Sequence, residues 1–287
     1  MSTEIPKVKL GIIGGSTLWN SGFPNETYSD EVIQSGLIFG TPFGKTAKFT
    51  HARIGHNEFL FVPYHGITRD ILPQTPDSAF ERVFYVLYKA GVQKIISSAT
   101  CGSLDPNLKP GDFLVLDDFI NFTTHRAISF GLSMLSKNEP FERTFIRMRQ
   151  PFCPNMSKII FEEAKKSSYS RVLPFGTVAV VEGPRFESPA EVRFLQKIDA
   201  HVVSHHIFPE VVFARELGAC YSAFHVISNY GEGLVTNWTF DEMIEHDKSY
   251  SSINAEILTK VIKRLNVNDM SCGCATYRTP WSTLPEE

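Results

Sequence analysis

The chain has 287 residues, of which 43% are hydrophobic and 21% charged, and its 28 Lys and Arg against 31 Asp and Glu give a formal charge of -3. This composition is typical of a folded globular protein, and the length suffices for one large α/β domain or two ordinary ones. The near-neutral balance leaves no basic footprint for DNA or RNA, so we expect a small-molecule ligand and no nucleic-acid partner.

Apolar, β-branched runs alternate with helical patterns along the chain. The runs predict buried strands at residues 8–13, 59–62, 94–98, 113–116, 178–181 and 220–228. Apolar residues at three-to-four spacing predict helices at 78–90, 155–166, 189–197 and 210–217. This alternation favours a single α/β domain, residues 1–267, with a mixed, largely parallel sheet flanked by helices. The polar and aromatic stretch 123–149 is predicted to be a long excursion, a segment outside the regular helices and strands that is either functional or part of a subunit contact.

The C-terminal part begins with one long predicted helix, 239–265. Its acidic residues lie near its start and its basic residues near its end, which suits the helix dipole. Gly, Pro and Ser follow, so we expect residues 268–287 to form a loosely ordered tail. Cys272 and Cys274 in this tail could pair or help to bind a metal. Because no second Cys or His pair lies nearby at zinc spacing, we predict no metal site.

Signals for cellular location are few. The first nine residues carry charges and a proline where a secretory signal needs an apolar core, and no window of about 18 apolar residues is free of charge. We therefore expect no signal peptide and no membrane partner. Cys101, Cys153 and Cys220 have apolar or glycine-flanked neighbours, which indicates reduced thiols and a cytoplasmic protein.

Three clusters that follow apolar strands can carry chemistry. Gly11 to Ser16 offers small residues and a hydroxyl to an anion, Ser97 to Leu104 repeats the pattern, and Glu182 to Glu187 combines an aromatic face with a carboxylate. Ligands of open parallel sheets bind at the carboxyl ends of strands, so we expect these clusters to line one crevice. The structural alternatives are glycine turns, Ser and Thr that cap local backbone, and a helix start at Glu187.

Taken in order, these clusters resemble the trimeric purine nucleoside phosphorylase and methylthioadenosine phosphorylase family. The resemblance covers nearly the whole chain, and its further matches are Thr41 to Lys45, His65-Gly66, Pro110 to Asp112, Pro151 to Pro154 and Pro209 to Val212. It implies a nucleoside phosphorylase-like fold, a homotrimer and cleavage of the C1′–N9 bond of a purine nucleoside. It also implies no cofactor, with phosphate as the co-substrate that attacks C1′.

For the base, the resemblance points to Asn229 and Glu187 as catalytic residues. Family members that act on 6-aminopurines tend to place Asp at the position of Asn229, with a second Asp at the position of Gly231. An amide can donate to N7 or O6 while Glu187 accepts from N1–H, whereas an ionised Asp would repel O6. The resemblance therefore favours a hypoxanthine- or guanine-like base. The alternative is that Asn229 merely ends a strand.

For the sugar, the resemblance places Phe240 at the 5′ position. The 6-oxopurine enzymes use a His there and the methylthio enzymes an apolar side chain, so Phe240 argues for a 5′-deoxy or 5′-methylthio substituent. Phe145 falls where the neighbouring subunit contributes to the sugar site, or it is an ordinary interface aromatic. The other residues assigned to substrate binding are Ser16, Tyr64, Arg69, Ala99, Thr100, Cys101, Gly102, Phe186, Ser204 and His205.

The phosphate site departs from the family pattern. Tyr64 replaces an Arg, Ala99 a small hydroxyl residue and His206 a Ser or Thr, while His205 stands in place of a Met that contacts ribose. Ser16 and His65 remain, and Arg69 is a possible substitute cation. Losing one charge-assisted hydrogen bond costs about 1.5–3 kcal/mol.

Two readings of the nucleophile therefore stay open. Either phosphate is still bound, or His65, His206, Tyr64 and Asp70 hold and deprotonate a water, which makes the protein a hydrolytic nucleosidase. In either case we count His65 and His206 among the catalytic residues.

Other classes of protein remain as alternatives. The missing phosphate ligands would also fit an inactive purine-binding relative. A dinucleotide-dependent oxidoreductase lacks the third glycine of its fingerprint, and a metal hydrolase that uses the nine His lacks paired-ligand spacing.

Overall fold

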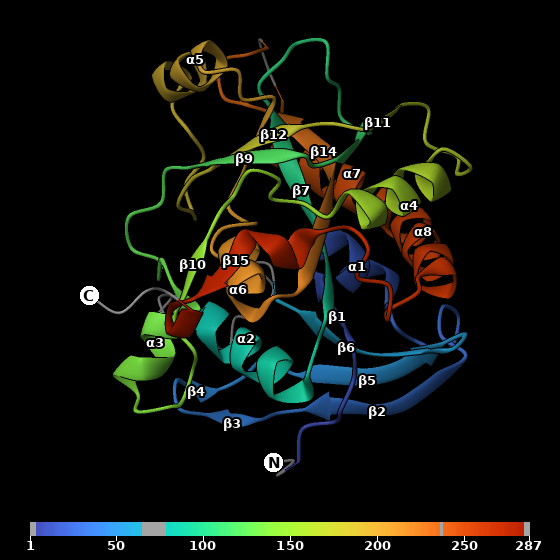
Figure 1. Cartoon of the computed structure of the whole chain (residues 1–287). Coiled ribbons are helices and arrows are strands. Elements are labelled where there is room, and N and C mark those ends of the chain that lie inside the picture. Colours follow the sequence, from blue (N-terminus) through green and yellow to red (C-terminus); the bar gives the residue numbers. More distant parts are fainter. Residues whose placement is uncertain (1–3, 65–78, 236–237, 284–287) are drawn as a thin grey trace.

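The structure, a computed structural model, describes residues 4–64, 79–235 and 238–283. Within them, an 11-stranded sheet forms the centre of the molecule, with β11-β8-β14-β7-β1-β6-β5-β2 in hydrogen-bonded order (Figure 1). Its middle is parallel: β14 (Cys220–Tyr230), β7 (Lys94–Ser103), β1 (Leu10–Gly14) and β6 (Asn57–Pro63) run in one direction. The predicted mixed, largely parallel sheet is confirmed.

The remaining strands extend or flank this middle. Antiparallel strands complete one side, and β9, β12 and β13 branch from the main path. They are β2 (Glu31–Leu37), β5 (Phe49–Ile54), β8 (Phe113–Val115), β9 (Asp118–Asn121), β11 (Val172–Leu173), β12 (Thr177–Val180) and β13 (Val202–Ser204). Two small sheets pair β3 (Gly40–Thr41) with β4 (Gly44–Lys45), and β10 (Thr144–Ile146) with β15 (Arg278–Pro280).

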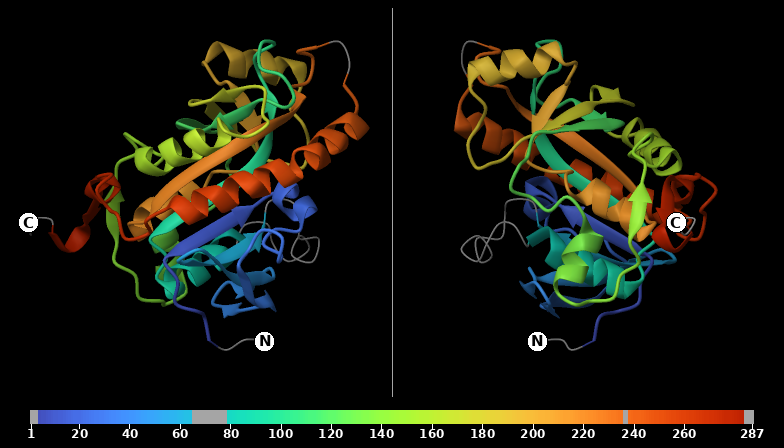
Figure 2. Two further views of the ribbon diagram at one scale, coloured as in Figure 1. Left: turned by 90° about the vertical axis from the view of Figure 1, so that its right-hand side faces the viewer. Right: turned by 60° about the vertical axis from the view of Figure 1, so that its left-hand side comes forward.

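Helices cover both faces of the sheet (Figure 2). They are α1 (Ser16–Ser21), α2 (Ala79–Ala90), α3 (Phe130–Ser136), α4 (Pro154–Ala164), α5 (Pro189–Lys197), α6 (Glu210–Leu217), α7 (Phe240–Ser249) and α8 (Ser251–Arg264). Helices α1 and α4 both contact α8 on one face, and α2, α3 and α6 contact one another on the other. Successive strand residues supply these two cores alternately, as Ile95 and Ile96 do in β7.

The prediction of one long C-terminal helix is wrong in one respect: the structure has two helices, α7 and α8, which meet at Tyr250. The Tyr250 ring stacks on Tyr169 at 5.3 Å and reaches over Gly111, where a Cβ would lie 2.1 Å from the tyrosine Oη. Helix α8 has a buried apolar face, whereas α7 has no buried residue. Tertiary contacts at Tyr250 thus set the break, and the charge pattern of the sequence carries no sign of it.

The expected loose tail is better ordered than its composition suggests. Residues after α8 include η3 (Cys274–Tyr277), strand β15 and η4 (Trp281–Thr283). Arg278 Nε donates to Glu216 O at 2.7 Å, which fastens the tail to the end of α6. No helix in the described part of the chain combines the length and apolar character that crossing a bilayer requires.

Candidate active site

The carboxyl ends of the central strands lie together at one edge of the sheet. Gly14 at the end of β1 is in register with Pro63 and Ser98 of its two neighbours. Tyr64 N–H donates to Gly14 O at 3.0 Å, and Ser16 opens helix α1 directly beyond. The edge therefore unites the first glycine cluster with the Ser97 to Leu104 cluster, although the latter is not a loop, because β7 continues to Ser103.

Asn229 lies beside Gly102 near the ends of β14 and β7. A bulge between Ile227 and Asn229 shifts the register so that Asn229 faces Gly102. A Cβ at position 102 would stand 3.3 Å from the Asn229 amide nitrogen, so glycine leaves room for the amide. The amide oxygen accepts from Ser228 Oγ at 2.9 Å, and its nitrogen donates to Tyr230 O at 3.0 Å. These bonds hold the amide plane and leave one N–H for a ligand.

Glu187 is buried in front of helix α5, with only 5% of its surface exposed. Burial raises the pKa of its carboxyl, and the nearby carboxylates of Glu191 and Glu232 raise it further. The chain directly after Asn229 packs on the same helix start, because a Cβ at Gly233 would lie 2.8 Å from Pro189 Cβ. Both residues assigned to the base thus belong to one corner of the molecule.

Ser16 is engaged by a carboxylate that the sequence did not single out. Its Oγ donates to Asp247 Oδ2 at 2.5 Å, and burial raises the pKa of Asp247. The other Asp247 oxygen is buried and finds no hydrogen-bond partner in the described part of the chain. Asp247 lies in the middle of α7 and belongs to no motif, so no local signal marked it. An anion at Ser16 therefore requires a proton on Asp247 or displacement of its carboxylate.

Tyr64 packs edge-on against Phe80, with 5.1 Å between the ring centroids. Burial, and next the charge of Glu210, raise the pKa of its phenol, so the hydroxyl stays protonated at neutral pH. Glu210 accepts hydrogen bonds from Ser97 Oγ at 3.0 Å and Tyr221 Oη at 2.8 Å. Tyr64 thus supplies a neutral hydroxyl where the resemblance implies a fixed charge.

Arg126 is a half-buried cation in the same neighbourhood. Its guanidinium lies 5.2 Å over the Phe80 ring and donates to Phe208 O at 2.6 Å. Burial lowers its pKa, while Tyr64, Glu182 and Glu210 act in the opposite direction. No motif in the sequence pointed to this residue either, although it falls in the excursion 123–149, for which a functional or interfacial role was expected.

The two adjacent histidines follow strand β13, with 6.5 Å between their ring centroids. Burial lowers the pKa of His205, which favours its neutral form, and its Nδ1 lies 3.3 Å from Val181 O. His206 is half-buried beside it. Ser204 Oγ donates to Thr100 O at 3.2 Å, so this segment adjoins β7.

The aromatic residues assigned to the sugar are exposed in the single chain. Phe186 packs edge-on against Trp238 at 5.4 Å, close to the start of α7, where Phe240 is 57% exposed. Phe145 lies on β10, 54% exposed, and stacks on Trp281 at 5.0 Å. Phe186 and Phe240 are therefore near one another in the fold, whereas Phe145 belongs to the small tail sheet.

Some assigned residues do not present a side chain to this edge. Cys101 is buried in the core and its thiol lies 3.7 Å from Val226 O, so its side chain is a packing group. Ala99 is buried as well. His65 and Arg69 lie outside the described residues, as does Asp70. An open hollow of about 760 Å³ beside α1 and β2, lined in part by Trp19 and Lys48, contains none of the predicted site residues.

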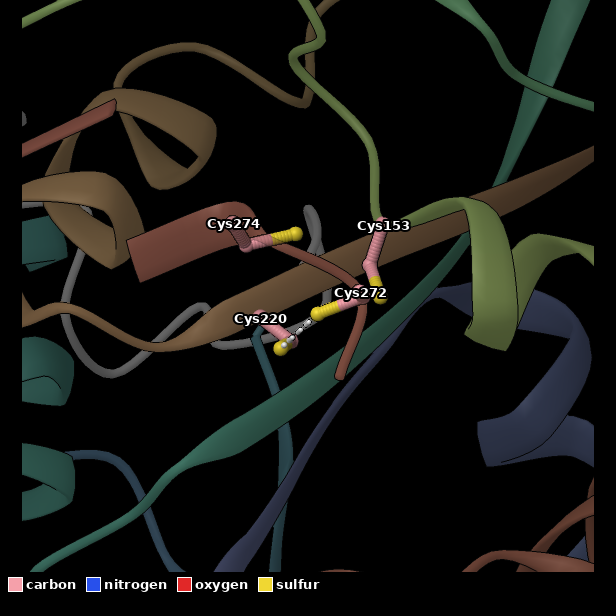
Figure 3. A group of neighbouring side chains, drawn as sticks. All are labelled: Cys153, Cys220, Cys272 and Cys274. Atoms are coloured by element: carbon pink, nitrogen blue, oxygen red, sulfur yellow. Dashed lines mark hydrogen bonds between the residues drawn. The ribbon is translucent and has the colours of Figure 1, made fainter. Parts of the chain in front are cut away.

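One side-chain group in the described ranges has the composition of a metal site. Cys153, Cys220, Cys272 and Cys274 lie together (Figure 3). Cys220 begins β14 and Asn229 stands near its end, roughly 30 Å away at the usual rise per strand residue. This cluster is therefore remote from the residues assigned to the base.

A family model described as "Phosphorylase superfamily" matches residues 9–263. The chain belongs to this superfamily. It is 31% identical over 270 residues to 6-oxopurine nucleoside phosphorylase of Pyrococcus furiosus, which covers 93% of this chain and 96% of the relative. It is 31% identical over 268 residues to S-methyl-5′-thioadenosine phosphorylase of Pyrococcus abyssi, with the same coverage of each.

The fold agrees with that membership. Methylthioadenosine phosphorylase from Schistosoma mansoni, solved in complex with adenine, superposes with a TM-score of 0.79 over 94% of this chain and 96% of that chain, at 24% identity. The family predicted from the ordered motifs is confirmed. This chain is an enzyme of the nucleoside phosphorylase type.

Proposed function

We propose that this enzyme cleaves the N-glycosidic bond of a purine nucleoside by phosphorolysis. The observation that carries the proposal is the Asn229 amide, held beside Gly102 with one N–H to spare, in the same corner as the buried Glu187 carboxyl. Cleavage leaves negative charge on the purine, and a fixed amide donor at N7 or O6 stabilises that charge. The names of the two Pyrococcus relatives support the same reaction class.

The base we propose is a 6-oxopurine. Its N1–H is a donor that an ionised Glu187 accepts, and its O6 is an acceptor that suits the Asn229 amide. A 6-aminopurine presents an unprotonated N1 to Glu187 and would leave the carboxylate without a donor.

The 5′ substituent we propose is apolar, as in a 5′-methylthio or 5′-deoxy nucleoside. Phe240 stands at the position assigned to this group, and Phe186 and Trp238 provide aromatic surface nearby. A 5′-hydroxyl gains no hydrogen bond from these side chains, whereas a thioether gains sulfur–aromatic contacts. A 5′-methylthio-6-oxopurine nucleoside combines both features.

Phosphate requires a cation in place of the lost arginine, and we propose Arg126 for that role. Arg126 lies beside Tyr64, and Tyr64 is the residue that replaces the arginine of the family pattern. Hydrolysis is the second candidate, and a specific contact favours it. The Ser16 hydroxyl, which would donate to phosphate, donates to the Asp247 carboxylate instead.

The decisive experiment identifies the sugar product from inosine, guanosine and 5′-methylthioinosine, with and without phosphate. Pentose 1-phosphate that forms only with phosphate supports the proposal, and free pentose in phosphate-free buffer supports hydrolysis instead. If none of the nucleosides releases its base under either condition, while adenosine is also inert, the chain is a binding protein and the proposed function is wrong.

For the assembly we propose a homotrimer in which Phe145 of one subunit reaches the sugar of the next. Its exposure in the single chain and its place on a surface sheet support this role. The cytoplasmic location stays a prediction from the sequence.

A further inference from the structure

Four of the five cysteines converge at the edge of the sheet opposite the proposed active site (Figure 3). Cys153 precedes helix α4, Cys220 begins strand β14, and Cys272 and Cys274 come from the tail. Their Sγ atoms all lie within 4.8 Å of one another, and the Cys220 and Cys272 sulfurs are 3.3 Å apart. Segments more than 50 residues apart in the sequence thus meet at one point.

The spacing of these sulfurs matches a tetrahedral metal site. Zinc–thiolate bonds of about 2.3 Å place four sulfurs about 3.8 Å apart around the ion. A disulfide draws two sulfurs to about 2.05 Å and needs only two partners, so it does not account for four thiols around one centre. All four are free thiols in the structure. Four sulfur ligands in this arrangement are typical of zinc or an iron–sulfur centre.

The local backbone suits a shared ligand. Gly273 separates the two tail cysteines and adopts a left-handed φ of 75°, and the space where a Cβ would stand is open to 4 Å. This turn allows Cys272 and Cys274 to face the same point although only one residue lies between them. A residue with a Cβ would adopt this conformation only with strain.

The surroundings also favour thiolates. Lys94 is buried, and its ammonium lies 3.9 Å from Cys220 Sγ. Cys153 is the N-cap residue of helix α4, so the start of that helix lies beside the cluster. A buried cation and a helix start beside the thiols reduce the cost of the negative charge that a tetrathiolate centre carries.

We propose that Cys153, Cys220, Cys272 and Cys274 bind one Zn²⁺ as a closed structural site. Each thiol that becomes a ligand releases its proton to solvent, and no electron is transferred. Four protein ligands leave no open position for substrate, so the ion has no catalytic task.

Its role is to fasten the tail to the core. Arg215 Nη1 already donates to Cys274 O at 2.7 Å, and β15 follows four residues later and pairs with β10. The ion would therefore hold in place the strand that carries Phe145. This role does not depend on the proposed reaction.

The test uses the full chain, purified without chelator and under reducing conditions. We expect elemental analysis to find one zinc per chain, and alkylation of the native protein to leave the four cluster thiols unmodified until zinc is removed. A reduced, metal-free sample should take up one Co²⁺ with a thiolate charge-transfer band that added Zn²⁺ displaces. Alkylation after unfolding without reductant that finds only one free thiol would show two disulfides instead and overturn the proposal, as would the absence of Zn²⁺ and Co²⁺ binding by the reduced chain.

Two matched variants locate the ion. Cys272→Ser should lower the zinc affinity at least tenfold and lower Tm only in the zinc-loaded state. Cys101→Ser removes the one thiol outside the cluster and should retain one zinc per chain. Equal zinc content in both variants would contradict the assignment. Because the thiol count and metal titration use the unsubstituted chain, the proposal stays testable if a variant fails to fold.

Discussion

In the proposed function, base specificity depends on a single amide at position 229. Asn229→Asp replaces the N–H that would face O6 with an ionised oxygen, which repels O6 and accepts from a 6-amino group. We expect the ratio of adenosine to inosine turnover, measured as kcat/KM, to rise by about tenfold or more. An unchanged ratio would show that Asn229 does not contact the base, and that it only ends the strand.

If Glu187 accepts from N1–H as proposed, binding of a 6-oxopurine depends on pH. The ionised carboxylate is the form that accepts from N1–H, and burial raises its pKa above the ordinary value of 4.5. As pH falls, KM for inosine should therefore rise at a higher pH than an exposed glutamate would dictate.

Glu187→Gln is the control for this pH dependence, because it keeps the shape and cannot ionise. The ionised group of the parent protein costs stability above its unfolded-state pKa, since the folded state holds the proton more tightly. The variant should therefore lose the acid rise in KM and gain more in Tm at pH 7 than at pH 4. A variant that keeps the acid rise would assign the titration to another group.

Arg126 bears on the choice between phosphate and water. Arg126→Ala should raise KM for phosphate by about ten- to a hundredfold, which corresponds to the loss of one charge-assisted hydrogen bond of about 1.5–3 kcal/mol. KM for the nucleoside should change much less, and Arg126→Lys should restore part of the loss. If phosphate dependence is unaltered in the alanine variant, the cation of this site lies elsewhere.

The residues that the sequence reveals are those within continuous motifs. Asn229 and Glu187 were assigned through the resemblance to the family, whose ordered motifs include the Glu182 to Glu187 cluster and the segment around Asn229. Asp247 could not, since its partner Ser16 is 231 residues away and nothing near Asp247 marks it. Arg126 becomes a candidate only in the folded structure, where its guanidinium contacts the Phe80 ring and the Phe208 carbonyl.

At the scale of elements, helix α7 carries both Phe240, which we propose for the 5′ pocket, and Asp247, which accepts a hydrogen bond from Ser16. Thr239 and Glu242 form a capping box at its start, with the Thr239 hydroxyl accepting from Glu242 N–H at 3.2 Å. No residue of α7 is fully buried, although its Asp247 carboxyl is shielded and bonded to Ser16, so packing contributes less to its stability than it does in α8.

Loss of this cap should therefore affect the site more than the whole fold. Thr239→Ala should cost about 1 kcal/mol in the free energy of unfolding of this segment. Hydrogen exchange should show faster opening of residues 240–249, with α8 unchanged, and kcat/KM should fall. Thr239→Ser retains the cap and is the control. Uniform protection in both variants would mean that α7 is held by other contacts.

Long elements with strong patterns were predictable, whereas the exposed strand β2 and the short strand β13 were not. The predicted ranges 189–197 and 210–217 coincide with α5 and α6, because a proline stands at or just before the start of each and apolar residues recur through both. Strand β2 was not predicted, because most of its residues are exposed and its pairing with β5 is irregular. Hydrophobic patterns in a sequence reflect burial, so an exposed edge strand shows only a weak alternation of apolar residues.

At the scale of the molecule, the proposed trimer predicts a solution mass three times the 32.3 kDa of the chain. Light scattering coupled to size exclusion measures this directly. Phe145→Ala should keep the trimer but lower kcat/KM for the nucleoside, since one side chain is a small part of an interface of standard size. A monomer with full activity would remove Phe145 from the site.

The hydrogen bond between Ser16 and Asp247 joins the first helix to the seventh, across 231 residues. Strand β1, near the N-terminus, is likewise at the centre of the sheet, between β6 and β7. A chain emerging from the ribosome can pair β1 with β6 and β7 once residue 103 has been made, but it cannot join Ser16 to Asp247 until almost all of it has been made. Such non-local closure slows folding, because the entropy of a long loop is lost before its contacts form. The candidate active site is therefore among the last parts to be completed, and a nascent chain that stops before α7 lacks Asp247 beside Ser16.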